Sequence, residues 1–257
     1  MNNLKSFGRK FKHLVLKKNG IDEFQFSGNT SLDIKDDIKT KYGYSGALLE
    51  IFADNKSEEV HKWHHYIPIY DRYFSRFRGR KIRFLELGVS KGGSLQMWRK
   101  YFGDEAIIFG IDINKDCAIF NGKAGQVRIG SQADPEFLDS VVQEMGGVDI
   151  VLDDGSHQMN HIKTSLLHLF PKINYGGIYL IEDLHTSYWK NYGGGYNTKG
   201  NFFYFLFQIV DDMHNWYHKR GIKKLNISKD CSGIHIHDSI VIFDKDKNYK
   251  PVHSQNS

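Results

Sequence analysis

The chain has 257 residues, a formal net charge of +5, and 40% apolar and 25% charged residues. This balance argues against a disordered or fibrous chain and predicts a globular protein large enough for an α/β domain with an additional element. Cys117 and Cys231 lie far apart and form no paired motif, which argues against a disulfide framework or a zinc module and favours a reducing, cytoplasmic location.

The basic residues concentrate at the N-terminus. Residues 1–20 carry six lysines and arginines and no acid, so a charge of +6 in this arm leaves −1 for the rest. A basic arm on a near-neutral body is not the pattern of a nucleic-acid-binding domain. Apolar residues recur in it at helical spacing. We therefore expect an amphipathic helix that packs on the body or a partner subunit, or that makes a weak contact with a membrane surface.

The arm lacks the uninterrupted apolar core of a signal peptide. The longest apolar run of the chain, residues 202–210, is too short to span a bilayer. Residues 21–45 are polar and predict a linker or a turn region. Residues 46–78 predict helix, because aromatic residues recur three and four positions apart, with an interruption at Pro68.

From residue 81 onward, short apolar runs alternate with helical segments. Strands are predicted within 81–89, 106–113, 148–154 and 176–184, and helices within 92–102, 135–145 and 161–173. This alternation is typical of a doubly wound, mostly parallel α/β sheet with crossover helices. Residues 233–246 alternate apolar and polar side chains and predict strands that close one sheet edge. We expect a basic arm with a helical N-terminal extension over 1–78 and an α/β domain over 79–257.

A glycine-rich turn follows the first predicted strand. It runs from Glu86 through Gly88 to Ser94 and matches neither the dinucleotide fingerprint nor the P-loop. An acid two residues before the first glycine suits a ligand whose nearby group is an ammonium or sulfonium rather than a phosphate. Asp112 ends the second strand, where a carboxylate can accept both hydroxyl hydrogens of a ribose. Glu86, Gly88 and Asp112 together predict a nucleoside cofactor site.

The turn after the third strand offers further candidates for this site. Ser131, Gln132 and Asp134 are placed to meet the adenine of such a cofactor. The alternative for all three is an ordinary loop that leads into a helix cap, and the sequence leaves both possibilities open.

Two pairs of acids end the next strands. Asp153–Asp154 and Glu182–Asp183 would converge on one crevice, because ligands bind at the carboxyl ends of the strands in an open parallel sheet. Such carboxylates repel one another unless a cation joins them or their pKa values rise. Oxygen donors without cysteine favour a hard cation such as Mg²⁺. We predict Asp154, Glu182 and Asp183 as metal ligands and Asp153 as a cofactor contact; solvated strand ends are the alternative.

A histidine follows the first acid pair. His157 would serve as a general base, since imidazole titrates near neutrality, and a structural turn histidine is the alternative. His161 lies one helical turn further along. The two histidines lack the glutamate of the H-E-x-x-H motif, which argues against a zinc protease.

Four segments together carry a family resemblance: FLELGVSKGGSLQMW, GIDIN, IVLDDGSH and YLIEDLHTSYW. They resemble class I S-adenosylmethionine-dependent methyltransferases, and more closely the metal-dependent sugar O-methyltransferases of macrolide assembly and bacterial surface-polysaccharide pathways. The resemblance covers about residues 60–245. It implies a Rossmann-like fold, S-adenosylmethionine and Mg²⁺ as cofactors, a sugar or glycoconjugate substrate, and a homo-oligomer.

The resemblance also implies roles for particular residues. His157 would take the proton from a sugar hydroxyl, and Asp154, Glu182 and Asp183 would bind Mg²⁺. Residues 1–60 match nothing in the family, which leaves the acceptor and the assembly open. The predicted cofactor contacts are Glu86, Gly88, Ser94, Asp112, Ser131, Asp134 and Asp153.

The leading hypothesis is therefore an S-adenosylmethionine- and Mg²⁺-dependent O-methyltransferase that acts on a sugar hydroxyl. The alternatives are a catechol-type O-methyltransferase and a catalytically silent scaffold in glycan assembly. A nicotinamide oxidoreductase is disfavoured by the missing glycine pattern. Residues 185–201, rich in glycine and aromatic residues, suit a mobile lid that stacks on a sugar, or an ordinary surface loop.

Overall fold

A seven-stranded sheet forms the centre of the protein in a computed structural model that describes residues 32–219, 225, 227 and 229–256. The predicted basic arm lies outside the described residues. The strand order is β3-β2-β1-β4-β5-β7-β6. The strands are β1 (Arg83–Leu87), β2 (Ile107–Asp112), β3 (Gln126–Ile129), β4 (Val148–Asp153), β5 (Ile173–Ile181), β6 (Cys231–His237) and β7 (Ile240–Lys245).

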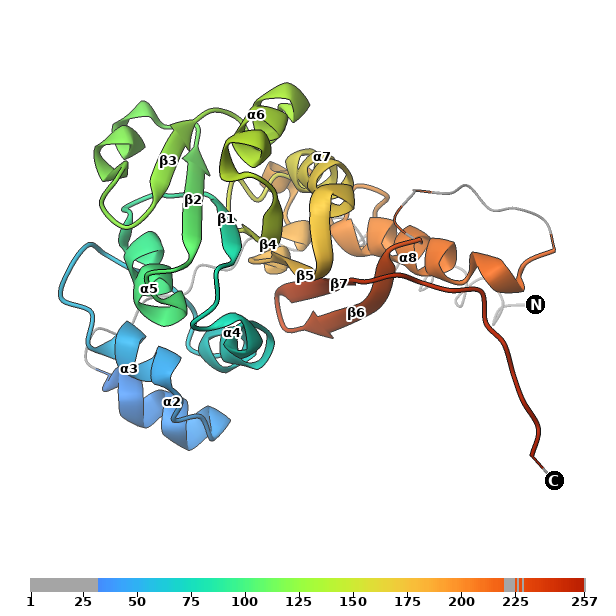
Figure 1. Ribbon diagram of the computed structural model, residues 1–257, viewed down its shortest axis with the longest axis horizontal. Helices are drawn as coiled ribbons and strands as arrows, with labels where there is room; N and C mark the ends of the chain where they lie inside the picture. The colour runs from blue at the N-terminus through green and yellow to red at the C-terminus, as the bar shows by residue number, and fades with distance from the viewer. Residues whose placement is uncertain (1–31, 220–224, 226, 228, 257) are drawn as a thin grey trace, which may run out of the picture.

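The sheet is parallel from β3 to β5 and antiparallel at one edge. There, β7 pairs antiparallel with both β5 and β6, and β6 and β7 are the dark-red strands of Figure 1. The closing strands predicted at residues 233–246 are therefore confirmed, and the chain has the predicted doubly wound α/β fold. Strand order reverses between β1 and β4, which is where an open α/β sheet forms a ligand crevice.

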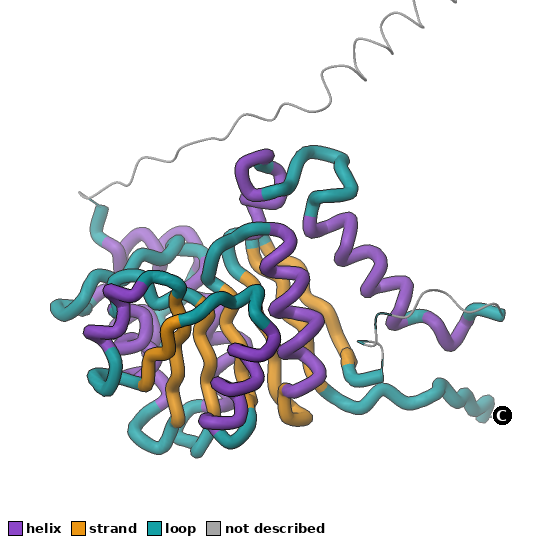
Figure 2. Tube along the Cα trace, turned by 90° about the horizontal axis from the view of Figure 1, so that it is seen from above, coloured by secondary structure: helices purple, strands orange, loops and turns teal. Residues whose placement is uncertain are grey.

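Helices cover both faces of the sheet (Figure 2). One hydrophobic cluster joins one face of the sheet to the helices of the N-terminal half, and a second cluster joins the opposite face to the later helices. The first set is α2 (Ile34–Tyr42), α3 (Ala47–Ala53), α4 (Tyr66–Phe74) and α5 (Gly93–Phe102); the second is α6 (Pro135–Met145), α7 (Met159–Leu169) and α8 (Phe202–Met213).

Three local predictions differ from the structure. The helix predicted over 46–78 is wrong for residues 54–65, which connect α3 to α4 without helix. The linker predicted over 21–45 was wrong for its described part, since Asp33 caps a helix there by accepting from the Asp36 N–H, and Ile38 is buried. Pro68 does not interrupt a helix. It lies in the first turn of α4, where its missing N–H would have no intrahelical partner in any case.

The helical segment before the sheet shares its hydrophobic core. The rings of Tyr70 and Phe74 in α4 lie 5.3 and 5.4 Å from the indole of Trp98 in α5. Phe84 of β1 belongs to the same cluster. Residues 32–78 therefore pack directly on the α/β domain, and the domain boundary at 78/79 stays a prediction. None of the helices within the described ranges has the length and apolar character needed to cross a membrane.

Candidate active site

Two adjoining cavities open at the carboxyl ends of the parallel strands. The larger, of about 400 Å³, is lined by the glycine turn after β1, the ends of β4 and β5, and a segment that precedes α4. The smaller, of about 190 Å³, is lined by the ends of β2 and β3. Both cavities share Gly88, Ser90, Asp154 and Gly155. One crevice therefore runs across the strand ends, as the sequence predicted.

The glycine turn forms the wall between the cavities. Gly88 has φ +100°, and a Cβ placed there would lie 2.1 Å from the backbone oxygen of Asp154, so the position requires glycine. Asp112 holds the turn from β2, because its carboxylate accepts from the N–H groups of Val89 and Ser90 at 2.9 and 3.0 Å. Burial opposes its charge, yet these backbone N–H groups and that of Asn114 hold the pKa of Asp112 below its usual value.

Glu86 lies behind this turn. It is fully buried, and its oxygens accept from Ser94 Oγ at 2.8 Å and Trp98 Nε1 at 3.2 Å. Burial raises the pKa of Glu86 to about 7. Ser94 lines the larger cavity, whereas Glu86 lines neither. The strand directs the Glu86 carboxylate into the core beneath α5, and its contact with a ligand cation stays a prediction.

Asp153 also differs from its predicted position. Its side chain is buried and accepts from Tyr179 Oη and Ser165 Oγ, each at 2.7 Å, and from Gln132 Nε2 at 2.9 Å. Asp153 lines neither cavity, and burial raises its pKa. Successive side chains of a strand point to opposite faces, so only Asp154 of this pair can reach the crevice.

Of the three residues after β3 that were predicted to meet the adenine, two line a cavity. Ser131 and Gln132 line the smaller cavity. Asp134 does not; its carboxylate caps α6 by accepting from the N–H groups of Glu136 and Phe137 at 3.0 and 3.2 Å. The helix-cap alternative is therefore the observed role of Asp134.

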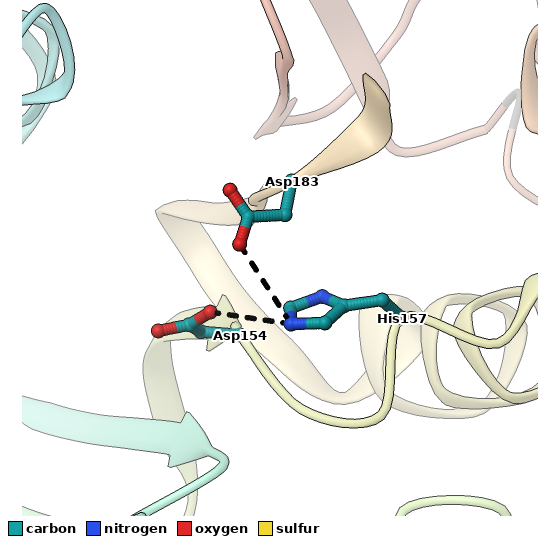
Figure 3. Close-up of side chains that lie close together, drawn as sticks. All are labelled: Asp154, His157 and Asp183. Carbon is teal, nitrogen blue, oxygen red and sulfur yellow. Dashed lines mark ion pairs between the residues drawn. The ribbon is translucent and has the colours of Figure 1, made fainter. Parts of the chain in front are cut away.

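Asp154, His157 and Asp183 meet at the mouth of the larger cavity (Figure 3). His157 Nε2 lies 3.8 Å from Asp154 Oδ1 and 3.7 Å from Asp183 Oδ2. The candidate ligand atoms of the three residues all lie within 4.8 Å of one another, and each side chain is partly buried. Two carboxylates and one imidazole at this spacing could hold a divalent cation. Glu182 is not in this group, and its role as a metal ligand with Asp154 and Asp183 stays a prediction.

Lys62 is the site residue that the sequence analysis missed. Its ammonium donates to Asp154 Oδ2 at 2.5 Å and to the two oxygens of Glu182 at 3.0 and 3.1 Å. The Lys62 side chain is 2% exposed and that of Glu182 is 1% exposed. Although burial opposes the charge, the carboxylates of Asp154 and Glu182 raise the pKa of Lys62, so it remains protonated. Lys62 precedes its partners by 92 and 120 residues, and no local pattern marks it.

Aromatic rings pack beside the crevice, and of these Trp63 and His157 line the larger cavity. His185 lies 5.9 Å from Trp63 and 4.9 Å from Trp189, and Tyr192 lies 6.4 Å from His157, measured between ring centroids. Trp189 and Tyr192 belong to the segment predicted as a lid. This segment folds back on itself, with the Gly195 N–H donating to the Ser187 carbonyl at 2.8 Å, and its mobility stays a prediction.

No family model matches the chain. It is similar to the 8-demethyl-8-(2-methoxy-alpha-L-rhamnosyl)-tetracenomycin-C 3'-O-methyltransferase of Streptomyces olivaceus, with 34% identity over 79% of this chain and 55% of the relative. It is also similar to the mycinamicin VI 2''-O-methyltransferase of Micromonospora griseorubida, with 32% identity over 72% of this chain and 49% of the relative. The chain thus spans about half the length of these curated relatives.

A solved structure supports the same relationship. The MycE methyltransferase of mycinamycin biosynthesis, in complex with Mg, SAH and mycinamycin VI, matches 88% of this chain and 58% of its own chain. The TM-score is 0.68 and the sequence identity is 28%. The chain therefore belongs to the class I S-adenosylmethionine-dependent methyltransferases and is a homologue of the macrolide-type sugar O-methyltransferases.

Proposed function

We propose that the protein transfers a methyl group from S-adenosylmethionine to a sugar hydroxyl, in a reaction that depends on Mg²⁺. The observation that carries this proposal is the meeting of Asp154, His157 and Asp183 beside a cavity that adjoins the glycine turn. The named activities of the relatives, which are sugar O-methyltransferases, support the same reaction class. The acceptor belongs to a glycosylated natural product or a bacterial polysaccharide.

The smaller cavity suits the nucleoside of the cofactor. Asp112 lines it and would accept hydrogen bonds from the ribose hydroxyls, while Ser131 and Gln132 would face the adenine. The turn at Gly88 would let the cofactor approach the protein backbone closely. Ser94 would lie near the amino-acid end of the cofactor, in the larger cavity.

The larger cavity suits the acceptor and the metal. Asp154 and Asp183 would hold Mg²⁺, with Glu182 as the third predicted ligand once Lys62 leaves it. When bound, Mg²⁺ supplies positive charge that orients sugar oxygens and stabilises a developing alkoxide. His157 Nε2 would accept the proton of the reacting hydroxyl, and the resulting oxygen nucleophile would attack the methyl carbon as the carbon–sulfur bond breaks. The aromatic rings of Trp63 and Trp189 offer apolar faces on which a sugar can stack.

The proposal also includes the oligomeric state and the cellular location of the protein. We expect a homo-oligomer, which is supported by the exposed aromatic side chains of Tyr204 and Phe207 on α8. The two cysteines are buried and unbridged, in keeping with a cytoplasmic location. A membrane contact of the basic arm falls outside the described residues. Size-exclusion chromatography with light scattering tests the oligomer directly, and a monomer would contradict it.

Asp154→Asn tests the proposed reaction. Methyl transfer to rhamnosylated aglycones, simple rhamnosides and catechols is measured with Mg²⁺ and with chelator, and S-adenosylhomocysteine binding is measured by calorimetry. We expect the wild type to methylate a sugar in a Mg²⁺-dependent reaction. Asp154→Asn should lower kcat about 10²–10³-fold, because it removes a carboxylate at the reacting centre, while cofactor affinity changes little.

Asp104→Asn is the matched control, since Asp104 is exposed and distant from the strand-end acids in sequence. Methylation of catechols alone would replace the sugar assignment with the catechol alternative. Cofactor binding without transfer to any acceptor would favour a silent scaffold. Full activity of Asp154→Asn would refute the metal and acid assignment.

A further inference from the structure

The acid cluster already contains a cation of the protein itself. Lys62 reaches it from the segment before α4, and its ammonium lies between Asp154 and Glu182. Three short contacts, at 2.5, 3.0 and 3.1 Å, engage one oxygen of Asp154 and both oxygens of Glu182. Two of the three predicted metal ligands are therefore already paired with a buried ammonium.

This pairing has an electrostatic reason. Glu182 is 1% exposed, and a buried carboxylate without a partner is strongly unfavourable. Glu86 and Asp183 add further acid nearby, since the charges of both act on the Lys62 and Glu182 pair. Burial and the charge of Asp154 raise the pKa of Glu182, whereas the Lys62 ammonium opposes this rise and favours the carboxylate. Lys62 thus supplies a positive charge at the position where a divalent cation would also find its ligands.

The first residue of α4 fixes the remaining acid in a different manner. Tyr66 Oη donates to Asp183 Oδ1 at 2.6 Å, which leaves Asp183 Oδ2 directed toward His157. This hydroxyl contact carries no charge and leaves one oxygen of Asp183 free. Lys62, in contrast, opposes a cation both by occupying carboxylate oxygens and by its own charge.

We propose that Lys62 competes with the divalent cation for Asp154 and Glu182 and thereby sets the affinity of the metal site. In the metal-free protein the ammonium occupies these carboxylates; binding of the cation requires Lys62 to give up part of its contacts. Lys62 is thus a positioning residue that keeps the cluster neutralised before the cation arrives. The inference rests on the metal dependence of the proposed function.

Mn²⁺ binding and thermal stability test the competition. Calorimetry and electron paramagnetic resonance measure Mn²⁺ affinity, and melting temperature is measured in chelator and in saturating Mn²⁺. We expect Lys62→Met to bind Mn²⁺ at least about tenfold more tightly than the wild type, because a competing charge has been removed. Its melting temperature should fall in chelator and recover in Mn²⁺ by more than the wild type gains.

Two further variants separate competition from a merely structural role. Lys62→Met combined with Glu182→Gln removes both partners, so it should fold stably in chelator and lose the gain in Mn²⁺ affinity. Lys123→Met removes an exposed lysine that pairs with Glu58 in the same region, and it should leave both readouts unchanged. If Lys62→Met alone does not fold without metal, it can be refolded and titrated in Mn²⁺. The double variant then provides a comparison that folds in chelator.

The outcomes distinguish this inference from the proposed function. Unchanged or weaker Mn²⁺ affinity in Lys62→Met overturns the competition, even if the wild type is a metal-dependent methyltransferase. Binding by Lys62→Met but not by the wild type supports the competition while removing Mg²⁺ from the proposed reaction. Absence of Mn²⁺ binding in both proteins overturns both ideas.

Discussion

His157 and Asp183 meet in the crevice with an unusual backbone conformation. Both have φ +55°, in the left-handed region that residues other than glycine seldom adopt. Such positions persist where the surrounding structure fixes them, and they gather at functional sites. The conformation directs His157 Nε2 to within 3.7 Å of Asp183 Oδ2. Strain at these two residues therefore accompanies the contact on which the proposed chemistry depends.

Gly88→Ala tests the turn between the cavities. A new Cβ would meet the Asp154 carbonyl at 2.1 Å, and a backbone oxygen cannot move away without shifting the strand end. We expect a lower melting temperature and at least about tenfold weaker S-adenosylhomocysteine binding, a loss of about 1.4 kcal/mol. Gly122→Ala is the control: it has φ +81° but open space, so it should cost about 1 kcal/mol of stability without affecting cofactor binding. Normal cofactor affinity in Gly88→Ala would contradict this account.

Glu86→Gln tests the buried acid beneath the turn. Its pKa is raised from 4.5 to about 7 in the folded protein, so ionisation disfavours the folded state. The contribution of Glu86 to stability is therefore highest below about pH 4.5 and falls as pH rises toward 7, by up to about 3 kcal/mol. Glutamine cannot ionise, so the stability of Glu86→Gln relative to wild type should increase across this window. Urea unfolding at about pH 5 and about pH 8 measures the difference, and Glu105→Gln, at an exposed position, should show none.

At the scale of elements, the segment leading into α4 completes a crevice that the strand ends begin. It supplies Lys62 to Asp154, and α4 supplies Tyr66 to Asp183, so residues outside the α/β alternation orient the acids that follow β4 and β5. The elements themselves follow local rules. Strands lie where the sequence has short apolar runs. The helix α6 begins directly after its capping aspartate, Asp134.

Asp134→Ala tests whether this aspartate serves the helix or the cofactor. Removing the cap of α6 should cost about 1 kcal/mol of stability, because two N–H groups lose their acceptor. Cofactor affinity should stay within about a factor of two, a difference of about 0.4 kcal/mol. Chemical unfolding and calorimetry measure the two quantities. A tenfold loss of affinity with unchanged stability would restore the cofactor contact that the sequence left open.

For the whole molecule, the helices before the sheet and the sheet itself form one core. Phe74 of α4 stacks among Tyr70, Phe84, Trp98 and Phe102, all within 6.1 Å between ring centroids. The crevice depends on this packing, since α4 and the segment before it carry the side chains that reach the acids. Loosening α4 should therefore affect fold and site together.

Phe74→Ala tests this shared core. Removing the buried ring should lower the free energy of unfolding by about 3–5 kcal/mol. Urea unfolding followed by far-ultraviolet circular dichroism and by tryptophan fluorescence should give a single coincident transition, because Trp98 reports on α5 and the dichroism on all helices. Two separate transitions would show that residues 32–78 and the α/β domain unfold independently.

Local sequence patterns predicted most of the strands and helices and the end of the sheet at which the candidate site lies. Periodicity, glycine turns and acids after apolar runs are local features, so they predicted the alternating strands and helices, the turn at Gly88 and the acids Asp154 and Asp183. The family resemblance also came from local segments of the sequence. The helix Ile34–Tyr42, within the stretch predicted as a linker, was missed because the burial of Ile38, which the polar composition does not reveal, comes from tertiary packing.

The partners of these acids depend on tertiary packing. The side chain of Asp153 points into the core, and that of Asp154 points into the crevice. Alternate strand residues face opposite sides of the sheet, and packing decides which side is buried. Lys62 found partners 92 and 120 residues away, and a contact of that range leaves no periodic trace in the chain. Local patterns place charged groups at strand ends, whereas the packing of α4 on the sheet decides which charges meet.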